Sequence, residues 1–374
     1  MSKTGLHDFL ISPAETARRR GPHDRIVMSS RVRLARNLKE GVFPGWAKKP
    51  ERIRVLELIR PAVESLPELT QTFSETMDNL SQLDKQILVE RHLISREHAA
   101  KNAGSGLVLN RDETLCVMIN EEDHLRMQAL RPGLQLRQAW QAIDHLDSEL
   151  EEKLNYAFSN ELGYLTACPT NLGTGIRVSA MLHLPGLVLA EQINPIIQSV
   201  NKLGLAVRGL YGEGTEALGN VFQVSNQMTL GETESTIVER LEKVLAQIIE
   251  HEENARATLI EKKAKVVYNH IGRAYGILAN AHSISSKETM NLLSLLRLGV
   301  DNGLFPGVDR SLADELFIMT QPAHLQRQHS EKLSAEERDL LRADMLRERL
   351  KQVSRPTIKS GGPGDTGLDK AAKP

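Results

Sequence analysis

Five arginines lie on, or at the ends of, segments whose alternation of polar and apolar residues predicts β-strands. They are Arg31, Arg33, Arg126, Arg177 and Arg208. An arginine side chain stays protonated and presents a planar fork of donors that matches phosphate oxygens, so a convergent group of arginines can hold a polyphosphate. Pairing with scattered carboxylates would account for one or two of these arginines, whereas five favour a nucleotide-binding site.

Three consecutive acidic residues at 121–123 follow the apolar run LCVMI after a single asparagine, Asn120. Such a run predicts a strand buried on both faces, and the acids at its end favour a functional site over a solvated turn. Carboxylates beside a phosphate site suggest a cationic acceptor such as a guanidinium, which has a pKa above about 12 and is not nucleophilic while protonated. Two carboxylates, drawn from Glu121, Glu122 and Glu213, would align it with the γ-phosphorus and remove a proton. The arginines and a Mg²⁺ carried by the nucleotide would neutralise the phosphates.

The stretch CPTNLGTGIRVSAMLHLP at residues 168–185 combines a glycine-containing loop with a predicted strand. Gly173 and Gly175 would allow backbone N–H groups to approach an anion closely, although a turn that serves only the fold explains them equally well. The strict alternation that follows predicts a half-buried strand. Its polar face carries Arg177, Ser179, Met181 and His183.

Common nucleotide and metal motifs are absent from the sequence. No G-x-x-x-x-G-K-[ST] pattern occurs, which excludes a P-loop. The glycines at 212, 214 and 219 do not fit G-x-G-x-x-G, which excludes the Rossmann and protein-kinase glycine loops. The cysteines and His124 lack the paired spacing of a zinc site, so no metal ligand set is predicted in the protein.

The composition is that of an ordinary globular chain of 374 residues with a formal net charge of -1. This charge argues against nucleic-acid and membrane-surface binding, and no run approaches the roughly 18 apolar residues of a membrane span. No signal peptide is predicted. Cys116 and Cys168 do not make a disulfide framework, and we expect free thiols in a reducing cytoplasm.

The elements that must position these residues follow from the periodicity of the chain. Strands are predicted at 28–37, 85–95, 107–109, 115–119, 125–128, 177–184, 205–208 and 221–224. Helices are predicted at 51–66, 134–155, 189–203 and from about 233 onward. His92 lies near the end of the second predicted strand, where a lone histidine is usually structural. Beyond about 256 the pattern is wholly helical, with capping-box spacing at 285–288 and 334–337.

Four motifs together resemble the catalytic domain of guanidino (phosphagen) kinases such as arginine and creatine kinase. They are S.RVR..RN, NEEDHLR, CPTNLGTG.R and RG..GE...LGNVFQVSN, in the order of that family over residues 24–256. The resemblance implies an α+β fold in which helices flank a large antiparallel sheet. It also implies ATP with Mg²⁺ as the phosphoryl donor and a guanidinium as the acceptor.

The same resemblance implies roles for individual residues. Glu122 and Glu213 would grip the guanidinium, with Cys168 placed beside it and Glu121 as a further catalytic candidate. The nucleotide would contact Ser29, Ser30, Arg31, Val32, Arg33, His92, Arg126, Arg177, Val178, Ser179, Ala180, Met181, Arg208, Gly209, Leu210, Tyr211 and Gly212.

The chain departs from the phosphagen kinases at both ends. Those enzymes carry a helical domain before the S.RVR motif, whereas this chain has about 28 residues there and adds a helical region after the catalytic domain. That arrangement resembles the McsB-type protein arginine kinases of bacteria, in which an RDxxRA motif forms a phosphoarginine-binding pocket. RDLLRA at 338–343 would supply it here, although without the resemblance it reads as a solvated helix face. The pocket residues would be Arg338, Asp339, Arg342 and Ala343.

The sequence therefore predicts four regions along the chain. A flexible arm at 1–23 precedes a catalytic domain at 24–256. A helical domain at 257–354 would dimerise and bind phosphoarginine, and a disordered tail at 355–374 would end the chain.

The predicted function is ATP-dependent phosphorylation of arginine side chains in proteins. An open acceptor site would explain the missing N-terminal domain, because a protein side chain must reach in whereas a free amino acid must be enclosed. The alternatives are a kinase of free arginine and an inactive phosphoarginine-binding adaptor, and the intact Glu122 and Glu213 argue against the second. The resemblance implies a cytoplasmic homodimer or larger homo-oligomer in stress response and protein quality control. Its implied partners are a Clp protease, an activator protein and a heat-shock repressor.

Overall fold

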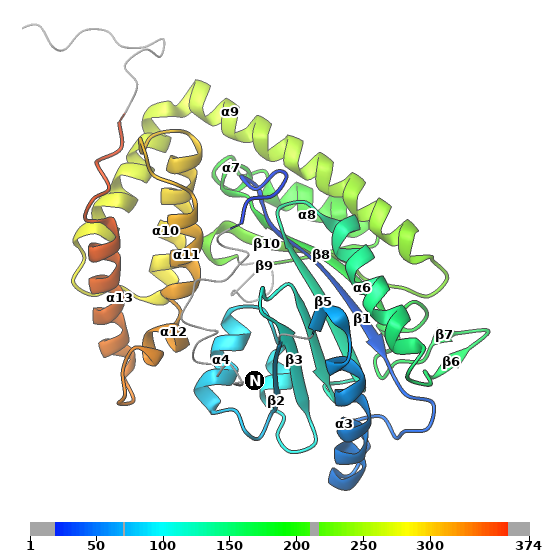
Figure 1. The fold of residues 1–374 in the computed structure, drawn as a ribbon. Helices are drawn as coiled ribbons and strands as arrows, with labels where there is room; N and C mark the ends of the chain where they lie inside the picture. The colour runs from blue at the N-terminus through cyan, green and yellow to red at the C-terminus, as the bar shows by residue number, and fades with distance from the viewer. Residues whose placement is uncertain (1–18, 70–71, 210–216, 358–374) are drawn as a thin grey trace, which may run out of the picture.

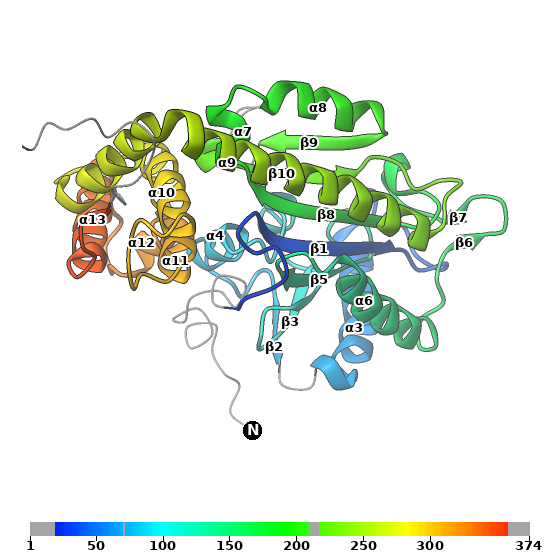
Figure 2. The same cartoon turned by 90° about the horizontal axis from the view of Figure 1, so that it is seen from above.

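The computed structural model describes residues 19–69, 72–209 and 217–357. Its centre is an eight-stranded antiparallel sheet, and helices cover one face of this sheet (Figure 1). Figure 2 shows a further group of helices, α10 to α13, at one end of the sheet. The predicted α+β fold class is therefore confirmed. The predicted arm up to residue 18, the segment 210–216 and the tail from 358 lie outside the described residues.

The strand order in the large sheet is β2-β3-β4-β5-β1-β8-β10-β9, and every neighbouring pair is antiparallel. Its strands are β1 Val27–Arg36, β2 Thr72–Thr76, β3 Gly106–Asn110, β4 Leu115–Ile119, β5 Leu125–Pro132, β8 Ile176–His183, β9 Leu205–Gly209 and β10 Val221–Asn226. A separate two-stranded sheet contains β6 Phe158–Ser159 and β7 Gly163–Tyr164.

Helices α3, α6, α8 and the first part of α9 pack on one face of the sheet and enclose its main hydrophobic core. Helices α4 and α5 lie on the opposite face, over β3 and β4. The helices are α3 Lys49–Glu64, α4 Gln82–Glu90, α5 Arg96–Ala99, α6 Leu136–Glu151, α7 Pro185–Leu189, α8 Ile193–Lys202, α9 Glu234–Asn280, α10 Ser286–Asp301, α11 Ser311–Met319, α12 Pro322–Arg327 and α13 Ala335–Leu350. None of these described helices is long and apolar enough to cross a membrane.

Strand β1 lies between β5 and β8, and its register aligns the polar faces of all three strands. Arg33 stands opposite Arg177 of β8 and Gln128 of β5. Because side chains alternate between the two faces of a strand, Arg31 and Arg126 lie on the same face as Arg33. Arginines from three strands are thereby brought to the sheet face opposite to the main core.

The prediction of a strand at 85–95 is wrong. Helix α4 occupies most of this segment and begins at Ser81, whose hydroxyl accepts a hydrogen bond from the backbone N–H of Asp84 at 3.1 Å. Ile87 and Leu88 are buried on the side of this helix that faces the sheet. A short apolar run is compatible with a strand and with a buried helix, and here the capping box of Ser81 and Asp84 favours the helix. His92 therefore stands in a turn after the helix, with a φ of 61°.

Helix α9 runs for 47 residues across the predicted domain boundary at 256/257. Its buried side chains up to Ala255 belong to the core of the sheet, whereas those from Leu259 belong to a second core with α10, α11 and α13. The helix is kinked at Lys263, where φ is -132° and ψ is 29°. One helix thus contributes to both cores, and the exact domain limits stay a prediction.

Buried ion pairs and hydrogen bonds fasten the helical region to the sheet. The guanidinium of Arg297 in α10 donates to the carbonyl of Arg25 at 2.9 Å and to His183 Nδ1 at 3.0 Å, and it pairs with Asp314 of α11 at 2.6 Å. Burial, and next the charge of Arg297, lower the pKa of His183 well below its ordinary value. His183, predicted on the polar face of its strand, is therefore a neutral contact between the sheet and α10.

Candidate active site

The arginines on the open sheet face form a row with little opposing charge. Arg31 donates from Nη2 to Gln223 at 2.8 Å, and its Nε lies 3.4 Å from Ser179 Oγ. Burial, followed by the charges of Arg126 and Arg177, lowers the pKa of Arg31 to about 10. The arginines therefore stay protonated at neutral pH, although their positive charges repel one another. A bound polyanion would relieve this repulsion, so the row attracts one.

Arg33 lies at the centre of this row. Burial, and then the charges of Arg31, Arg126 and Arg177, lower the pKa of Arg33 well below its ordinary value. Among the described residues, no hydrogen-bond partner meets its Nε. Buried polar atoms normally have a hydrogen-bond partner, so the free donor of this guanidinium indicates that a ligand binds there.

The fifth predicted arginine, Arg208, lies on β9 opposite Gln223 of β10. After burial, its charge is the largest influence that lowers the pKa of Arg177. Arg208 therefore belongs to the same electrostatic cluster as the other four. The predicted residues Leu210, Tyr211, Gly212 and Glu213 lie outside the described residues.

Four of the predicted nucleotide residues face away from this row. Val32, Val178 and Ala180 are buried in the core on the other side of the sheet. The hydroxyl of Ser30 donates to the carbonyl of Gly133 at 2.7 Å, so it serves the packing of a neighbouring loop. Because alternate residues of a strand point to opposite faces, these four side chains cannot line a site on the arginine face.

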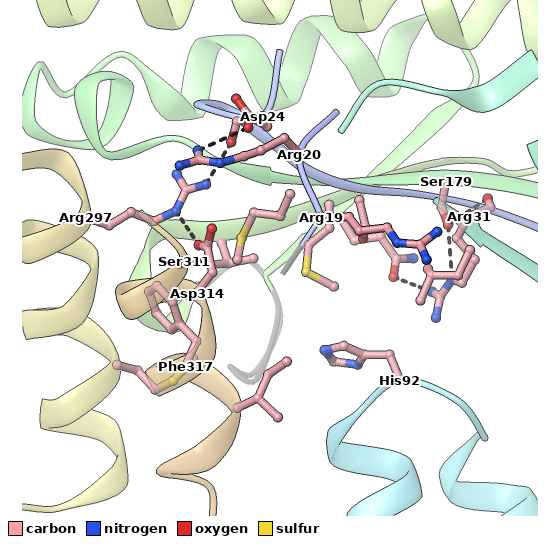
Figure 3. A pocket seen from close by; sticks show the side chains of 18 residues that line it. Arg19, Arg20, Asp24, Arg31, His92, Ser179, Arg297, Ser311, Asp314 and Phe317 are labelled. Atoms are coloured by element: carbon pink, nitrogen blue, oxygen red, sulfur yellow. Dashed lines mark hydrogen bonds and ion pairs between the residues drawn. The ribbon is translucent and has the colours of Figure 1, made fainter. Parts of the chain in front are cut away.

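His92 borders the same site from the turn after α4 and lies across from Arg31 (Figure 3). Its backbone carbonyl accepts a hydrogen bond from Gln128 Nε2 at 2.9 Å, which fixes the turn against β5. Burial, and next the charge of Arg31, lower the pKa of His92 to about 3. The imidazole is therefore neutral at pH 7 and can lie against an uncharged part of a ligand.

The three consecutive acids point in different directions, because Asn120 adopts a φ of 56° at the end of β4. Glu121 is buried and accepts hydrogen bonds from Ser95 at 2.5 Å and from Arg126 at 2.8 Å. Burial raises the pKa of Glu121, but Arg126, Ser95 and the backbone of Glu122 more than offset this and lower it. Glu121 therefore positions Arg126, and although it lines the cavity beside Glu122, its side chain is only 1% exposed.

Asp123 is also buried and holds a neighbouring loop. Its Oδ1 accepts hydrogen bonds from Asn37 Nδ2 at 2.6 Å and from the backbone N–H of Ala167 at 2.7 Å. Ala167 directly precedes Cys168, so Asp123 ties the acidic turn to the cysteine loop. This positioning contact joins residues 44 positions apart.

Glu122 is the exposed acid of this turn, and 45% of its side chain is accessible to solvent. It lines a cavity together with Phe43, Trp46, Glu97 and Thr166. Burial, and then the charges of Asp123 and Glu121, raise the pKa of Glu122. A carboxylate with a raised pKa in a cavity is suited to accept a proton.

Cys168 is half-buried, and its Sγ lies 3.0 Å from Thr170 Oγ1. The glycines that follow serve the fold: a Cβ at Gly175 would stand 2.6 Å from the carbonyl oxygen of Ala35 in β1. Cys116 is fully buried and donates to the carbonyl of Leu93 at 3.2 Å, and burial raises the pKa of its thiol. Of the two cysteines, only Cys168 lies near the acidic cavity.

Comparisons with known proteins agree with this geometry. Residues 54–255 match the family described as ATP:guanido phosphotransferase, C-terminal catalytic domain, and residues 264–361 match protein-arginine kinase McsB C-terminal domain. The protein-arginine kinase of Halothermothrix orenii is 46% identical over 330 residues, which cover 88% of this chain and 94% of that one. That of Bacillus licheniformis is 46% identical over 336 residues, covering 89% and 92%.

The chain belongs to the protein-arginine kinase family. Among solved structures, the duplicated taurocyamine kinase of Schistosoma mansoni with bound transition-state analogue components aligns with a TM-score of 0.57 and 26% identity, over 65% of this chain and 36% of that one. A lombricine kinase aligns with a TM-score of 0.55 and 23% identity, over 66% and 72%, and supports the fold alone. The predicted guanidino kinase fold and the enzyme class are therefore confirmed.

In this kinase the RDLLRA motif lies on α13, and its last two residues are buried. Arg342 is 1% exposed, and it donates to the carbonyls of Thr320 and Ile284, each at 2.9 Å, and to the Asp339 carboxylate. Ala343 is fully buried. Arg342 therefore joins α13 to the ends of two other segments, and the outward-facing part of the motif is Arg338 and Asp339.

This difference predicts unequal effects of two arginine substitutions on the stability of the kinase. Arg342→Ala is expected to lower the free energy of unfolding by about 2–5 kcal/mol, because it leaves two buried carbonyls and a carboxylate without their donor. Arg338→Ala removes a single contact to the Leu333 carbonyl and should change stability by about 0.5 kcal/mol or less. Urea unfolding of both variants is the measurement. Equal losses of stability would show that the motif is not divided in this way.

Several residues around Glu122 were not predicted from the sequence. Phe43 and Trp46 come from the loop between β1 and α3, and Glu97 comes from α5. The loop is held by His124, whose Nδ1 accepts from the N–H of Leu38 at 3.0 Å while its Nε2 lies 3.1 Å from the carbonyl of Val42. The available signal was the pair of aromatic residues in the polar, Pro/Gly-containing stretch at 41–49.

Proposed function

We propose that this protein-arginine kinase transfers the γ-phosphoryl group of ATP to an arginine side chain that another protein inserts beside Glu122. The observation that carries the proposal is the exposure of Glu122: its side chain is 45% exposed in the cavity, whereas that of Glu121 is 1% exposed, and Glu122 stands 3.7 Å from Arg126 of the arginine row. The proposed acceptor site at Glu122 and the proposed ATP site at the arginine row thus adjoin at Arg126. The family membership supplies the guanidinium as the acceptor class.

In the proposed mechanism, the arginine row holds the phosphates of ATP and stabilises the charge that develops during transfer. Glu122 accepts a hydrogen bond from the substrate guanidinium, directs one nitrogen at the γ-phosphorus and takes its proton as the N–P bond forms. The bond between the γ-phosphorus and the β-phosphate oxygen breaks in the same step, and the arginine row neutralises the charge on the departing ADP. Glu121 keeps Arg126 in place throughout.

The donor set of the site fits a Mg²⁺ that the nucleotide carries. The Glu121 carboxylate accepts a hydrogen bond from Arg126 and the Asp123 carboxylate accepts one from Asn37. Neither carboxylate is therefore oriented to coordinate a metal ion. Phosphate oxygens and water are the ligands that Mg²⁺ ordinarily keeps. When bound, the ion would add positive charge on the phosphates, where the arginines already act.

Glu213 and Cys168 complete the proposed acceptor site. Glu213 is assigned as the second carboxylate from its sequence motif, because it lies outside the described residues. Cys168 stands on the loop that Asp123 fixes. We place both beside the guanidinium.

The function is tested by incubating the kinase with Mg²⁺-ATP and unfolded casein, in parallel with free arginine, followed by mass spectrometry under conditions that preserve the acid-labile N–P bond. Phosphate on casein arginines is the expected result. Phosphate on free arginine alone would support the alternative of a small-molecule guanidino kinase. Binding of phosphoarginine without any transfer would support the adaptor alternative.

Trp46 at the mouth of the acceptor cavity supports a protein acceptor, because its side chain is 88% exposed and nothing in the described chain covers it. Trp46→Ala is expected to raise KM for casein about three- to tenfold, since an exposed aromatic side chain can contact residues that flank the target arginine. KM for ATP should stay the same. Steady-state kinetics measure both, with Leu162→Ala, an exposed apolar residue outside the cavity, as the control. An unchanged KM for casein would remove Trp46 from the acceptor site.

From the family resemblance we also infer the wider setting of the kinase. Phosphoarginine bound at Arg338 and Asp339 would act on activity, and the helical region would form a homodimer or larger homo-oligomer. The proposed partners are a Clp protease, an activator protein and a heat-shock repressor, in the cytoplasm. Light scattering of the purified chain would give the oligomeric state.

A further inference from the structure

A cavity at the far end of the arginine row lies between the sheet and the helical region. Ser29, Ser179 and Met181 of β1 and β8 line its catalytic side. Met290 of α10 and Phe317 and Ile318 of α11 line the opposite side. Figure 3 shows Phe317 and His92 on different sides of this space.

The cavity has two chemically different ends. Arg31 reaches into one end, close to the other arginines of the row. On the helical side, Met290, Phe317 and Ile318 supply a thioether, an aromatic ring and an aliphatic side chain. Arg297, Ser311 and Asp314 also line this side, and Arg297 is paired with Asp314. A ligand that fits both ends carries negative charge at one end and a flat, uncharged group at the other, because planar rings pack well against methionine sulfur and aliphatic surfaces.

We propose that the helical region completes the nucleoside-binding part of the ATP site. The base of ATP lies between Met181 and the neutral His92 on the catalytic side and Met290 and Ile318 on the helical side. The α-phosphate then lies at Arg31. This inference rests on the proposed function only in taking ATP as the ligand.

Contacts around the cavity hold its helical side in place. Gln321 Nε2 lies 3.1 Å from Met290 Sδ, and Asn291 accepts a hydrogen bond from the backbone N–H of Gly219 at 2.9 Å. Glu90 of α4 accepts hydrogen bonds from the N–H of Ala323 at 2.8 Å and from that of His324 at 3.1 Å, at the start of α12. Helix α4 ends just before His92, so both sides of the cavity are tied together. Bound nucleotide would bridge them as well and add stability to their interface.

The first test is direct binding of Mg²⁺-ATP to the full chain by calorimetry, which requires no phosphoryl transfer. Ile318→Ala is suitable because Ile318 is only partly buried, so its truncation should leave the fold intact. The dissociation constant is expected to rise about three- to thirtyfold, since part of the apolar contact with the base is lost. The control is Val266→Ala on α9, which is 53% exposed and does not line the cavity, and it should bind as the unaltered chain does.

A second test keeps the unaltered protein. Photolabelling with 2-azido-ATP should modify a peptide that contains Met290 or Ile318, and excess ATP should prevent the labelling. Labels on the catalytic region alone, or an unchanged dissociation constant for a folded Ile318→Ala variant, would overturn the inference. These outcomes are separate from a failure of the proposed function, in which ATP binds but no arginine is phosphorylated.

Discussion

Glu122→Gln is expected to lower kcat by about 10²–10⁴-fold while the affinity for ATP stays the same. The amide keeps the size of the side chain but cannot take the proton that the guanidinium must lose. Glu122 reaches the acceptor cavity and is half-exposed, so the substitution breaks no buried pair and the fold should be unaffected. Single-turnover phosphorylation of casein, with ATP binding measured separately, is the experiment.

Glu121→Gln is the matched control, because the two residues are adjacent and chemically identical. Glu121 holds Arg126 at 2.8 Å and is only 1% exposed at the cavity wall, so its substitution should weaken ATP binding more than the proton transfer. Normal turnover in Glu122→Gln together with lost turnover in Glu121→Gln would reverse the two assignments.

The pH dependence gives an independent check on Glu122. Burial, and then the charges of Asp123 and Glu121, raise the pKa of Glu122 above the ordinary glutamate value. A base acts in its deprotonated form, so kcat is expected to fall as the pH falls through this raised pKa. Glu122→Gln should lack that acidic limb, and its residual rate should not depend on pH in that range.

Arg33→Met is expected to lower the transfer rate by about 10²–10³-fold, as loss of one donor to the developing charge does. The same substitution should stabilise the ligand-free protein by about 1–2 kcal/mol, because it removes a positive charge that faces three other arginines. Arg33 has an unpaired Nε among the described residues, and Arg31, Arg126 and Arg177 all lower its pKa. The repulsion between these arginines therefore lowers the stability of the ligand-free protein and favours the binding of a polyanion.

Arg36→Met provides the contrast, because Arg36 is a buried arginine on the same strand with a committed partner. It pairs with Asp147 at 2.5 Å and lies 3.6 Å above the ring of Tyr164. Its loss leaves a buried carboxylate alone and should destabilise the protein by about 3–5 kcal/mol. Urea unfolding without nucleotide compares the two variants. A lower free energy of unfolding in Arg33→Met than in the unaltered chain would show that the Arg33 charge does not destabilise the ligand-free protein.

Adding ATP should reverse the order of stability between the unaltered chain and Arg33→Met. Nucleotide binds the folded state and stabilises it by an amount that increases with the logarithm of its affinity, which loss of the Arg33 charge should lower. Thermal unfolding with and without ATP is the measurement. An equal shift on addition of ATP in both proteins would indicate that Arg33 does not contact the nucleotide.

The sequence by itself determined most strands of the sheet but not β2, and it determined the polar face of β1 and β8 and the family of the chain. Alternation in β1 and β8 is a local property, because successive side chains of a strand must point to opposite faces. Arg31 and Arg33 were therefore placed together on one face before any contact was known, and the structure has them there. The run of acids after β4 was likewise predicted as a functional turn from its local sequence.

The tertiary structure alone decided which of those acids is exposed. Glu121 is buried against Arg126 and Asp123 against Asn37, which is distant in sequence, whereas Glu122 is half-exposed. The same reason underlies the helix α4 in place of a predicted strand, the buried position of Arg342, and the contribution of Ile318 to the cavity near Arg31. Local periodicity determines to which side of its own element a side chain points. Which partner meets it there depends on segments far apart in the chain, and no local pattern contains that information.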